Sequence, residues 1–143
     1  MEFAMRSRDK DNSSIVHAAD YFTRGSRTRL RRLARDPTAL SLVRAVAVER
    51  QVELESLLQT NRGNASIARS RQLAMYLVHV VLGRPQDVVG LLFGRDRTTV
   101  SHACHLMEDR RDDPSVESQI VTIERRFGSQ LGSGFAEEFE RVA

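Results

Sequence analysis

The stretch GRDRTTVSHAC, residues 94–104, is the most informative part of this chain. A glycine and a charged turn lead into two threonines and then into a run with helical spacing. One face of that run holds apolar or small residues at i, i+3, i+4 and i+7, which are Val100, Ala103, Cys104 and Met107. The opposite face repeats this spacing with short polar side chains, which are Thr98, Ser101, His102 and His105. The pattern predicts a helix over about 98–111 with one buried face and one polar face.

A second apolar segment, PQDVVGLLF at 85–93, precedes this helix. Pro85 starts a predicted helix, which buries Val88, Val89, Leu92 and Phe93. Gly94 and Arg95 turn the chain, so only about three or four residues join the two helices, as in a helix-turn-helix. We therefore predict a helix-turn-helix over about 85–111, in which Gly90 allows close helix packing.

The polar face of the second helix suits a DNA major groove. Short Thr, Ser and His side chains reach base edges and phosphates there without steric bulk. Arg95 and Arg97 lie at the helix start, where free N–H groups and the helix dipole already favour a phosphate. Thr98 and Thr99 could also simply cap the helix, and capping would not exclude a phosphate contact.

The rest of the chain is predicted to be helical as well, without strands or repeats. We expect disorder over 1–12, a short helix in 13–22, and either a basic arm or a helix over 24–35. Asp36 can cap a helix with Pro37 in its first turn, and helix continues on and off to about Gln59. Leu57 and Leu58 are expected to anchor that segment in the core.

The segment 61–66 is predicted to be a loop, and a helix over 68–83 follows, ended by Gly83. Its expected core face consists of Leu73, Leu77, Val80 and Val81. A later helix over 115–127 buries Val116, Ile120, Ile123 and Phe127. GSQLGSG at 128–134 is predicted to be a flexible linker before a short acidic tail. The predicted class is all-α, with a basic extension at 1–40, a DNA-binding domain at 41–127, and the linker and tail at 128–143.

The charges are unevenly distributed. Residues 24–35 contain six Arg and no acid, and residues 61–111 contain eight Arg against four acids. Residues 112–143 contain three Arg against seven acids. A basic centre with an acidic tail predicts a polyanionic partner, with one face of the protein turned away from it. A merely solvated surface is the alternative interpretation of any single charge run.

Two segments resemble the C-terminal DNA-binding domain (domain IV) of the bacterial replication initiator DnaA. They are ARSRQLAMYL at 68–77 and GLLFGRDRTTVSHAC at 90–104. The family pattern runs roughly R-Q-x-A-M-x-L and then G-x-x-F-G-x-R-D-H-T-T-V-x-H-A-C. Its first part is matched by Arg71, Gln72, Ala74, Met75 and Leu77. Its second part is matched by Gly90, Phe93, Gly94, Arg95, Asp96, Thr98, Thr99, Val100, His102, Ala103 and Cys104. The resemblance covers roughly residues 41–127.

The resemblance implies binding to double-stranded DNA at origin-box-like sites. It implies that Arg71 enters the minor groove and that Arg95 lies near a phosphate. It also implies that bases are read from the major groove by Asp96, Thr98, Thr99 and His102. The complete set of candidate DNA-binding residues is Arg69, Arg71, Gln72, Arg95, Asp96, Arg97, Thr98, Thr99, Ser101, His102 and His105.

The sequence departs from the family pattern at the start of the second helix. The turn after Phe93 is one residue shorter, and Arg97 stands where the family has His. The loop before Arg69 is also less basic than in the family. These departures predict either a different target box or relaxed specificity.

Several function classes are not supported by the sequence. There is no G-x-x-x-x-G-K-[ST] motif and the only lysine is Lys10, so we expect no P-loop, no bound nucleotide and no ATPase domain in this chain. Cys104 should face the core, away from His102 and His105, which predicts neither a metal site nor a nucleophile. We expect no cofactor and no enzymatic activity.

The expected compartment is the cytoplasm, with association to the nucleoid. A single cysteine allows no internal disulfide, and residues 1–14 lack the apolar block of a signal peptide. The longest apolar run, around 73–83, is too short to span a bilayer, so no membrane partner is expected.

Two functions remain open. The first is a stand-alone, sequence-specific binder of double-stranded DNA that modulates replication initiation or transcription. Its partners would include the replication initiator itself. The second is a protein-interaction module that binds replication initiation proteins and reads little DNA sequence. The set of Arg71, Thr98, Thr99 and His102 favours the first function, and the shortened turn with Arg97 favours the second.

Overall fold

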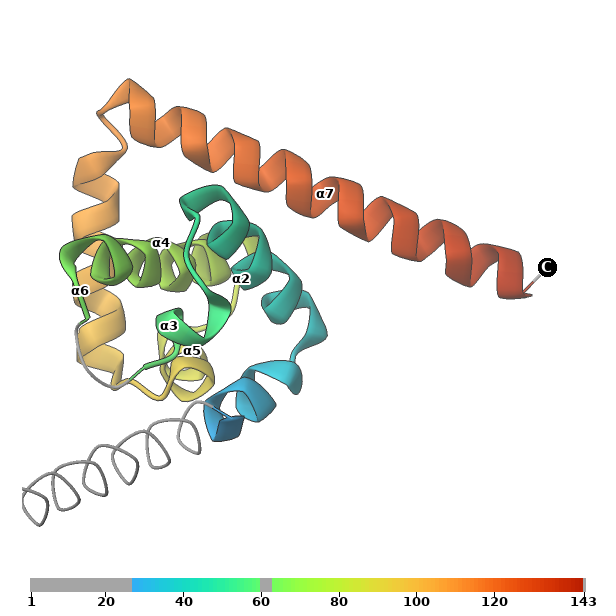
Figure 1. Cartoon of the computed structure of the whole chain (residues 1–143), viewed down its shortest axis with the longest axis horizontal. Coiled ribbons are helices and arrows are strands. Elements are labelled where there is room, and N and C mark those ends of the chain that lie inside the picture. Colours follow the sequence, from blue (N-terminus) through green and yellow to red (C-terminus); the bar gives the residue numbers. More distant parts are fainter. Residues whose placement is uncertain (1–26, 60–62, 143) are drawn as a thin grey trace, which may run out of the picture.

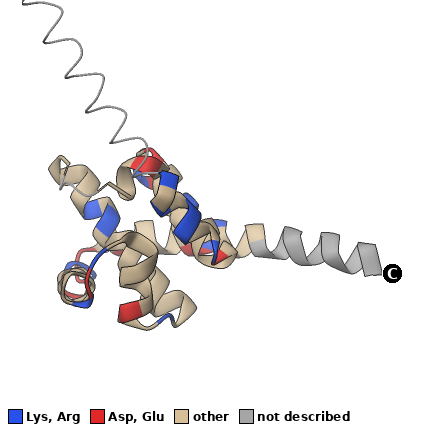
Figure 2. Cartoon of the chain, turned by 90° about the horizontal axis from the view of Figure 1, so that it is seen from below, with Lys and Arg blue, Asp and Glu red and all other residues tan. Residues whose placement is uncertain are grey.

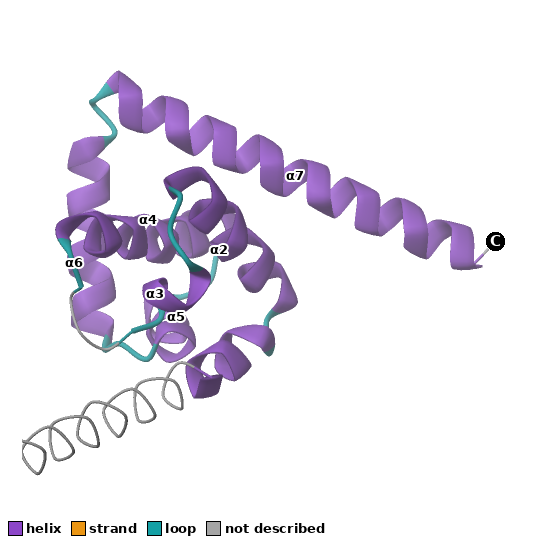
Figure 3. Cartoon of the chain, in the orientation of Figure 1, coloured by secondary structure: helices purple, strands orange, loops and turns teal. Residues whose placement is uncertain are grey.

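The computed structural model describes residues 27–59 and 63–142, with side chains described as far as residue 130. Every regular element in these ranges is a helix, which confirms the predicted all-α class (Figure 3). After a helical segment at 27–34 come α2 (Pro37–Arg50), α3 (Leu54–Leu57), α4 (Ala65–Leu82), α5 (Gln86–Phe93), α6 (Arg97–Arg110) and α7 (Pro114–Val142). The disorder predicted for 1–12 and the helix predicted for 13–22 lie outside the described residues.

Helix α4 is the centre of the packing. It contacts α2, α3, α5 and α6, and α7 packs along α2 (Figure 1). The core contains large side chains from most helices, and the fully buried ones include Leu42, Tyr76, Phe93, Ile120 and Ile123. Leu57 and Leu58 are also fully buried, as predicted. The α4 scaffold thus holds the helix-turn-helix, α5 and α6, against the rest of the body.

The start of α2 follows the sequence prediction. Asp36 is its N-cap, with its carboxylate accepting from the Ala39 amide at 3.2 Å, and Pro37 is in the first turn. The same carboxylate forms an ion pair with Arg84 at 2.8 Å. Gln51 ends α2 in the left-handed conformation, and the short α3 follows after two residues. Asp36 therefore connects the start of α2 to the chain just after α4.

Helix α4 differs from its prediction in where it begins and in the burial of its last turn. It begins at Ala65 rather than 68, because the Asn64 side chain accepts from the Ile67 amide at 2.9 Å and caps the helix. The loop predicted for 61–66 is therefore too long. Val80, predicted to be in the core, is 47% exposed, since burial falls off over the last turn of α4. Gly83 ends the helix at φ 67°, as predicted.

The prediction for α7 is right in its first half and wrong after it. Ile120, Ile123 and Phe127 are buried and Val116 packs against the core, as expected. The helix then continues to Val142, through the segment 128–134 for which the sequence predicts a flexible linker. A Cβ at Gly128 would meet no atom within 4 Å, so this glycine serves no close contact and only weakens a helix that it does not break.

The turn between α5 and α6 explains two glycines. Gly94 adopts φ 64°, the left-handed conformation that glycine tolerates best. A Cβ at Gly90 would lie 2.5 Å from the carbonyl oxygen of Arg95, and the Arg95 amide donates to the Gly90 carbonyl at 2.8 Å. Close packing at Gly90 was predicted against a neighbouring helix. The close neighbour is instead the backbone of the turn.

No helix in the described part of the chain combines the length and the apolar character needed to cross a membrane.

Candidate nucleic-acid interface

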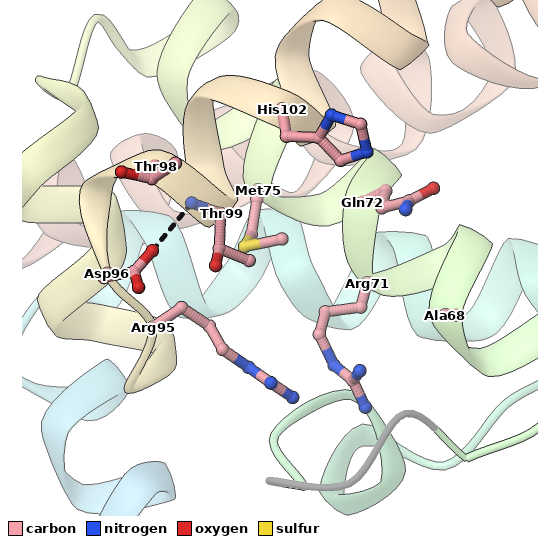
Figure 4. A pocket seen from close by; sticks show the side chains of 9 residues that line it. All are labelled: Ala68, Arg71, Gln72, Met75, Arg95, Asp96, Thr98, Thr99 and His102. Atoms are coloured by element: carbon pink, nitrogen blue, oxygen red, sulfur yellow. Dashed lines mark hydrogen bonds between the residues drawn. The ribbon is translucent and has the colours of Figure 1, made fainter.

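Helix α6 begins at Arg97, one residue before its predicted start, and Asp96 is its N-cap. The Asp96 carboxylate accepts from the Thr99 amide at 2.7 Å (Figure 4). This bond and one from the Thr99 hydroxyl lower the pKa of Asp96, which is consequently charged at neutral pH. Asp96, and not Thr98 or Thr99, therefore caps the helix, because its short carboxylate reaches the amide of the third residue after it. Thr98 and Thr99 lie in the first turn and are exposed.

The core face of α6 is as predicted. Val100 and Ala103 are at most 1% exposed, Met107 is 3% exposed and Cys104 is 8% exposed. Burial, with a smaller effect of Glu108, raises the pKa of the Cys104 thiol, which makes the thiolate scarce. The helix ends at Arg110, with Arg111 as its C-cap. The polar face of α6 is therefore the one left for a partner.

An open pocket of about 610 Å³ lies where the start of α6 faces α4. Its lining residues are Ala68, Arg71, Gln72, Met75, Arg95, Asp96, Thr98, Thr99 and His102. Figure 4 shows the α6 side chains of Thr98, Thr99 and His102 along one side and those of α4 along the other. The structure thus brings seven of the eleven candidate residues around one surface.

Arg71 is the most constrained residue of this pocket. It is only 5% exposed, and its guanidinium donates to the carbonyls of Leu57 at 2.8 Å and Ser56 at 3.2 Å. Burial, followed by the charges of Arg95 and Arg29, lowers the pKa of Arg71 to about 10. Arg71 is consequently still charged at neutral pH, and its guanidinium is held against the end of α3.

Arg95 approaches the same place from the turn before α6. Its guanidinium donates to the carbonyl of Gln59, and Figure 4 shows its side chain extending towards that of Arg71. Burial, with a further contribution from Arg29, lowers the pKa of Arg95. Two guanidinium groups thus converge below the polar end of α6.

The other candidate residues are placed differently. Arg97 and His105 are exposed on α6, and Ser101 is partly exposed, but none of them lines the pocket. Arg69 is exposed and lines a second pocket of about 380 Å³ with Arg50 and Arg110. Gln72 accepts from Arg110 at 3.0 Å and so lies between the two pockets. These residues extend the polar surface along α6 and α4.

Sequence reasoning missed three neighbours of this surface. Ala68 and Met75 line the pocket with Arg71 and Gln72, a spacing along α4 that helical periodicity would have revealed. The third is Arg29, whose Nε lies 3.3 Å from where a Cβ at Gly94 would be. The only sequence signal for Arg29 is its position in the Arg-rich segment 24–35. Across the described residues, no group of three or more His, Cys, Asp or Glu side chains is placed to hold a metal ion.

Comparison with known proteins agrees with this geometry. Residues 40–106 match the family model of the bacterial dnaA protein helix-turn-helix. The chain is 37% identical over 89 residues to the chromosomal replication initiator protein DnaA of Bartonella quintana, which covers 61% of this chain and 18% of that protein. It is 42% identical over 71 residues to DnaA of a Caulobacter strain, covering 48% of this chain and 15% of that protein.

A third relative gives the same result. DnaA of Lactococcus lactis is 43% identical over 63 residues, covering 43% of this chain and 14% of that protein. The chain therefore spans less than a fifth of the length of these relatives. The similarity to known proteins therefore lies in residues 40–106, which match the bacterial DnaA helix-turn-helix.

Proposed function

We propose that this chain binds double-stranded DNA sequence-specifically, at sites resembling the boxes of the replication initiator, and thereby regulates replication initiation or transcription at such boxes. The observation that supports this best is the gathering of seven predicted contact residues around one open pocket at the start of α6. The match of residues 40–106 to the DnaA helix-turn-helix supports the coarser part, DNA binding related to replication initiation.

In this proposal the first turns of α6 enter the major groove, which is about 12 Å wide and admits a helix. Thr98, Thr99 and His102 are exposed on α6 and reach base edges. Asp96 caps the helix through one oxygen, and its carboxylate can accept from a cytosine amino group. Arg97, exposed in the first turn, offers a bidentate guanidinium to a guanine or a single charge to a phosphate.

Arg71 is the proposed minor-groove residue, and its present position means that binding has a conformational component. Its guanidinium must exchange the carbonyls of Leu57 and Ser56 for the acceptors of the groove floor. The neighbouring charges of Arg95 and Arg29 disfavour the charged form where it lies and would favour this release. Narrow, A·T-rich grooves attract such an arginine most strongly.

The chain is proposed to act without ATP, since no P-loop occurs in the sequence. The replication initiator is a proposed partner, either at shared boxes or by direct contact. The second candidate function, protein interaction with little sequence reading, is favoured by Arg97 and by the shortened turn before α6. Both departures fall at the start of α6, the end of the helix that is proposed to face the DNA.

Genome-wide immunoprecipitation of the protein from its host tests the proposal. Occupied sites should share one box-like motif and should persist when the initiator is depleted. Occupancy that follows the initiator and disappears with it, without a motif of its own, would favour the protein-interaction function instead.

A further inference from the structure

The helical segment 27–34 is docked on the domain and is not a free arm. Leu33 is fully buried, and Leu30 packs against the same core. Four of its eight residues are arginines (Figure 2, blue). The segment also lies outside residues 40–106, which match the family model. Anything that it adds to the interface is therefore additional to the matched domain.

One of these arginines reaches the helix-turn-helix. Arg29 is partly buried, and its guanidinium donates to the carbonyl of Leu58. Its side chain also passes over Gly94, in the turn between α5 and α6, with its Nε 3.3 Å from the position that a Cβ there would take. In Figure 1 the blue segment accordingly lies beside α5 and this turn. Arg29 is thus held next to the proposed reading end of α6.

Three guanidinium groups from distant parts of the sequence converge at this place. Arg29, Arg71 and Arg95 donate to successive carbonyls of residues 56–59, at the end of α3. The charge of Arg29 acts on both of the others, which shows that the three groups are electrostatically close. Three positive charges held this close together attract an anion such as a phosphate.

We propose that Arg29 contacts a backbone phosphate of the bound duplex, beside the bases read by α6, so that segment 27–34 is part of the DNA interface. The inference rests on the proposed function, because it requires α6 to face the duplex. Arg29 then supplies affinity and orientation without base specificity, as phosphate contacts do.

The test is a titration of the full chain with a duplex at several salt concentrations, for the parent, Arg29→Gln and Arg31→Gln. Arg31 is exposed and about 200° further round the same helix, so its variant removes an equal charge from another side. We expect Arg29→Gln to lower the salt slope by about one unit and to weaken binding about five-fold near physiological salt. Arg31→Gln should lose less than half of either quantity, and Arg29→Lys should keep the parent slope.

Equal slopes and affinities for the Gln variants at positions 29 and 31 would overturn the phosphate contact. If the parent binds no duplex, the proposed function fails together with this inference. If the parent binds and Arg29→Gln binds equally well, only this inference fails. Should Arg29→Gln be unfolded at the titration temperature, a photo-crosslinker at position 29 replaces it. Crosslinking to the duplex is expected, and its absence while position 99 crosslinks would overturn the proposal.

Discussion

At the scale of single residues, the polar face of α6 gives the sharpest prediction. Thr99→Ala and His102→Ala should each lower the preference for a cognate box by about 1–3 kcal/mol, because each removes a proposed base contact. Binding to random duplex should change less, since phosphate contacts remain. Both side chains are exposed around the pocket, so the variants should fold normally. Competition titrations with cognate and random duplexes measure the difference.

Val100→Ala is the matched control on the same helix. Val100 is fully buried, so its truncation should lower the melting temperature through a lost core contact. Any effect of this variant on DNA binding should parallel the unfolded fraction. Variants of Thr99 and His102 that fold normally and bind every duplex as the parent does would contradict base reading and favour the protein-interaction function.

Arg97 is the second prediction at this scale, because it replaces the His of the family pattern. Its exposure in the first turn of α6 leaves its guanidinium available to a base or a phosphate. If it reads guanine, Arg97→His should change the preferred base at one position of the box towards the family box. If it holds a phosphate, the same change should weaken binding evenly across sequences. Binding of a panel of single-base box variants distinguishes the two outcomes.

The sequence predicts residues of this site unevenly, for a physical reason. The two faces of α6 follow from local helical spacing, and all four predicted core residues are buried. The motif identifies Arg71 as a candidate residue, but it does not predict where the Arg71 side chain lies. Its burial depends on the carbonyls of Ser56 and Leu57, which only the tertiary fold brings beside α4. The same holds for Arg29, whose neighbour Gly94 is far away in the sequence.

At the scale of elements, the turn between α5 and α6 depends on Gly90. Gly90→Ala should destabilise the protein by about 1–3 kcal/mol, because the new Cβ would lie 2.5 Å from the Arg95 carbonyl oxygen and force the turn to move. DNA binding should fall as well, since Arg95 and Asp96 follow this turn. Gly128→Ala in α7 is the control. Its Cβ meets nothing within 4 Å, so it should be neutral or stabilising by up to about 1 kcal/mol. Denaturant unfolding of both variants measures the difference. Equal free energies of unfolding for Gly90→Ala and Gly128→Ala would contradict the steric argument.

The start of α2 gives a pH-dependent prediction. The hydrogen bond from the Arg84 guanidinium is the main cause that lowers the pKa of Asp36, and the hydrogen bond from the Ala39 amide lowers it further. Burial acts in the opposite direction but is outweighed. When the pKa of a carboxyl group is lower in the folded than in the unfolded protein, its charge stabilises the fold at any pH above the unfolded-state pKa. This stabilisation is lost as the pH falls through the folded-state pKa. Asp36→Asn keeps a capping side chain but removes the charge, so it should cost up to about 1 kcal/mol at neutral pH. The gap between parent and variant should close below about pH 4. A constant gap across that range in thermal melts would contradict the ion pair with Arg84.

Helix boundaries were predictable where a cap or a glycine marks them. Asp36 before α2 and Gly83 after α4 are examples. The cap at Asn64 was overlooked within a polar stretch, and the glycines after Phe127 suggested a break that α7 does not make. A glycine lowers helix stability by only about 1 kcal/mol, so composition alone cannot locate the end of a helix.

At the scale of the whole molecule, the packed body is larger than the part that matches the family. The match ends at residue 106, within α6, yet Ile120, Ile123 and Phe127 of α7 are buried in the same core. Leu33 is buried there too, although the sequence placed it in an extension over 1–40. The basic segment 27–34 is thereby fixed beside the turn of the helix-turn-helix, where Arg29 approaches Gly94.

The central claim is that the start of α6 reads DNA sequence. Selection of bound molecules from a randomised duplex library by the purified chain, without nucleotide, tests it most directly. We expect one motif to be enriched, with an affinity for it at least about 10³-fold above that for shuffled duplex. The same selection with Thr99→Ala should lose information at one base position of that motif and keep the rest. A library that emerges unenriched, although the chain retains duplex at low salt, would contradict the claim and leave only non-specific binding.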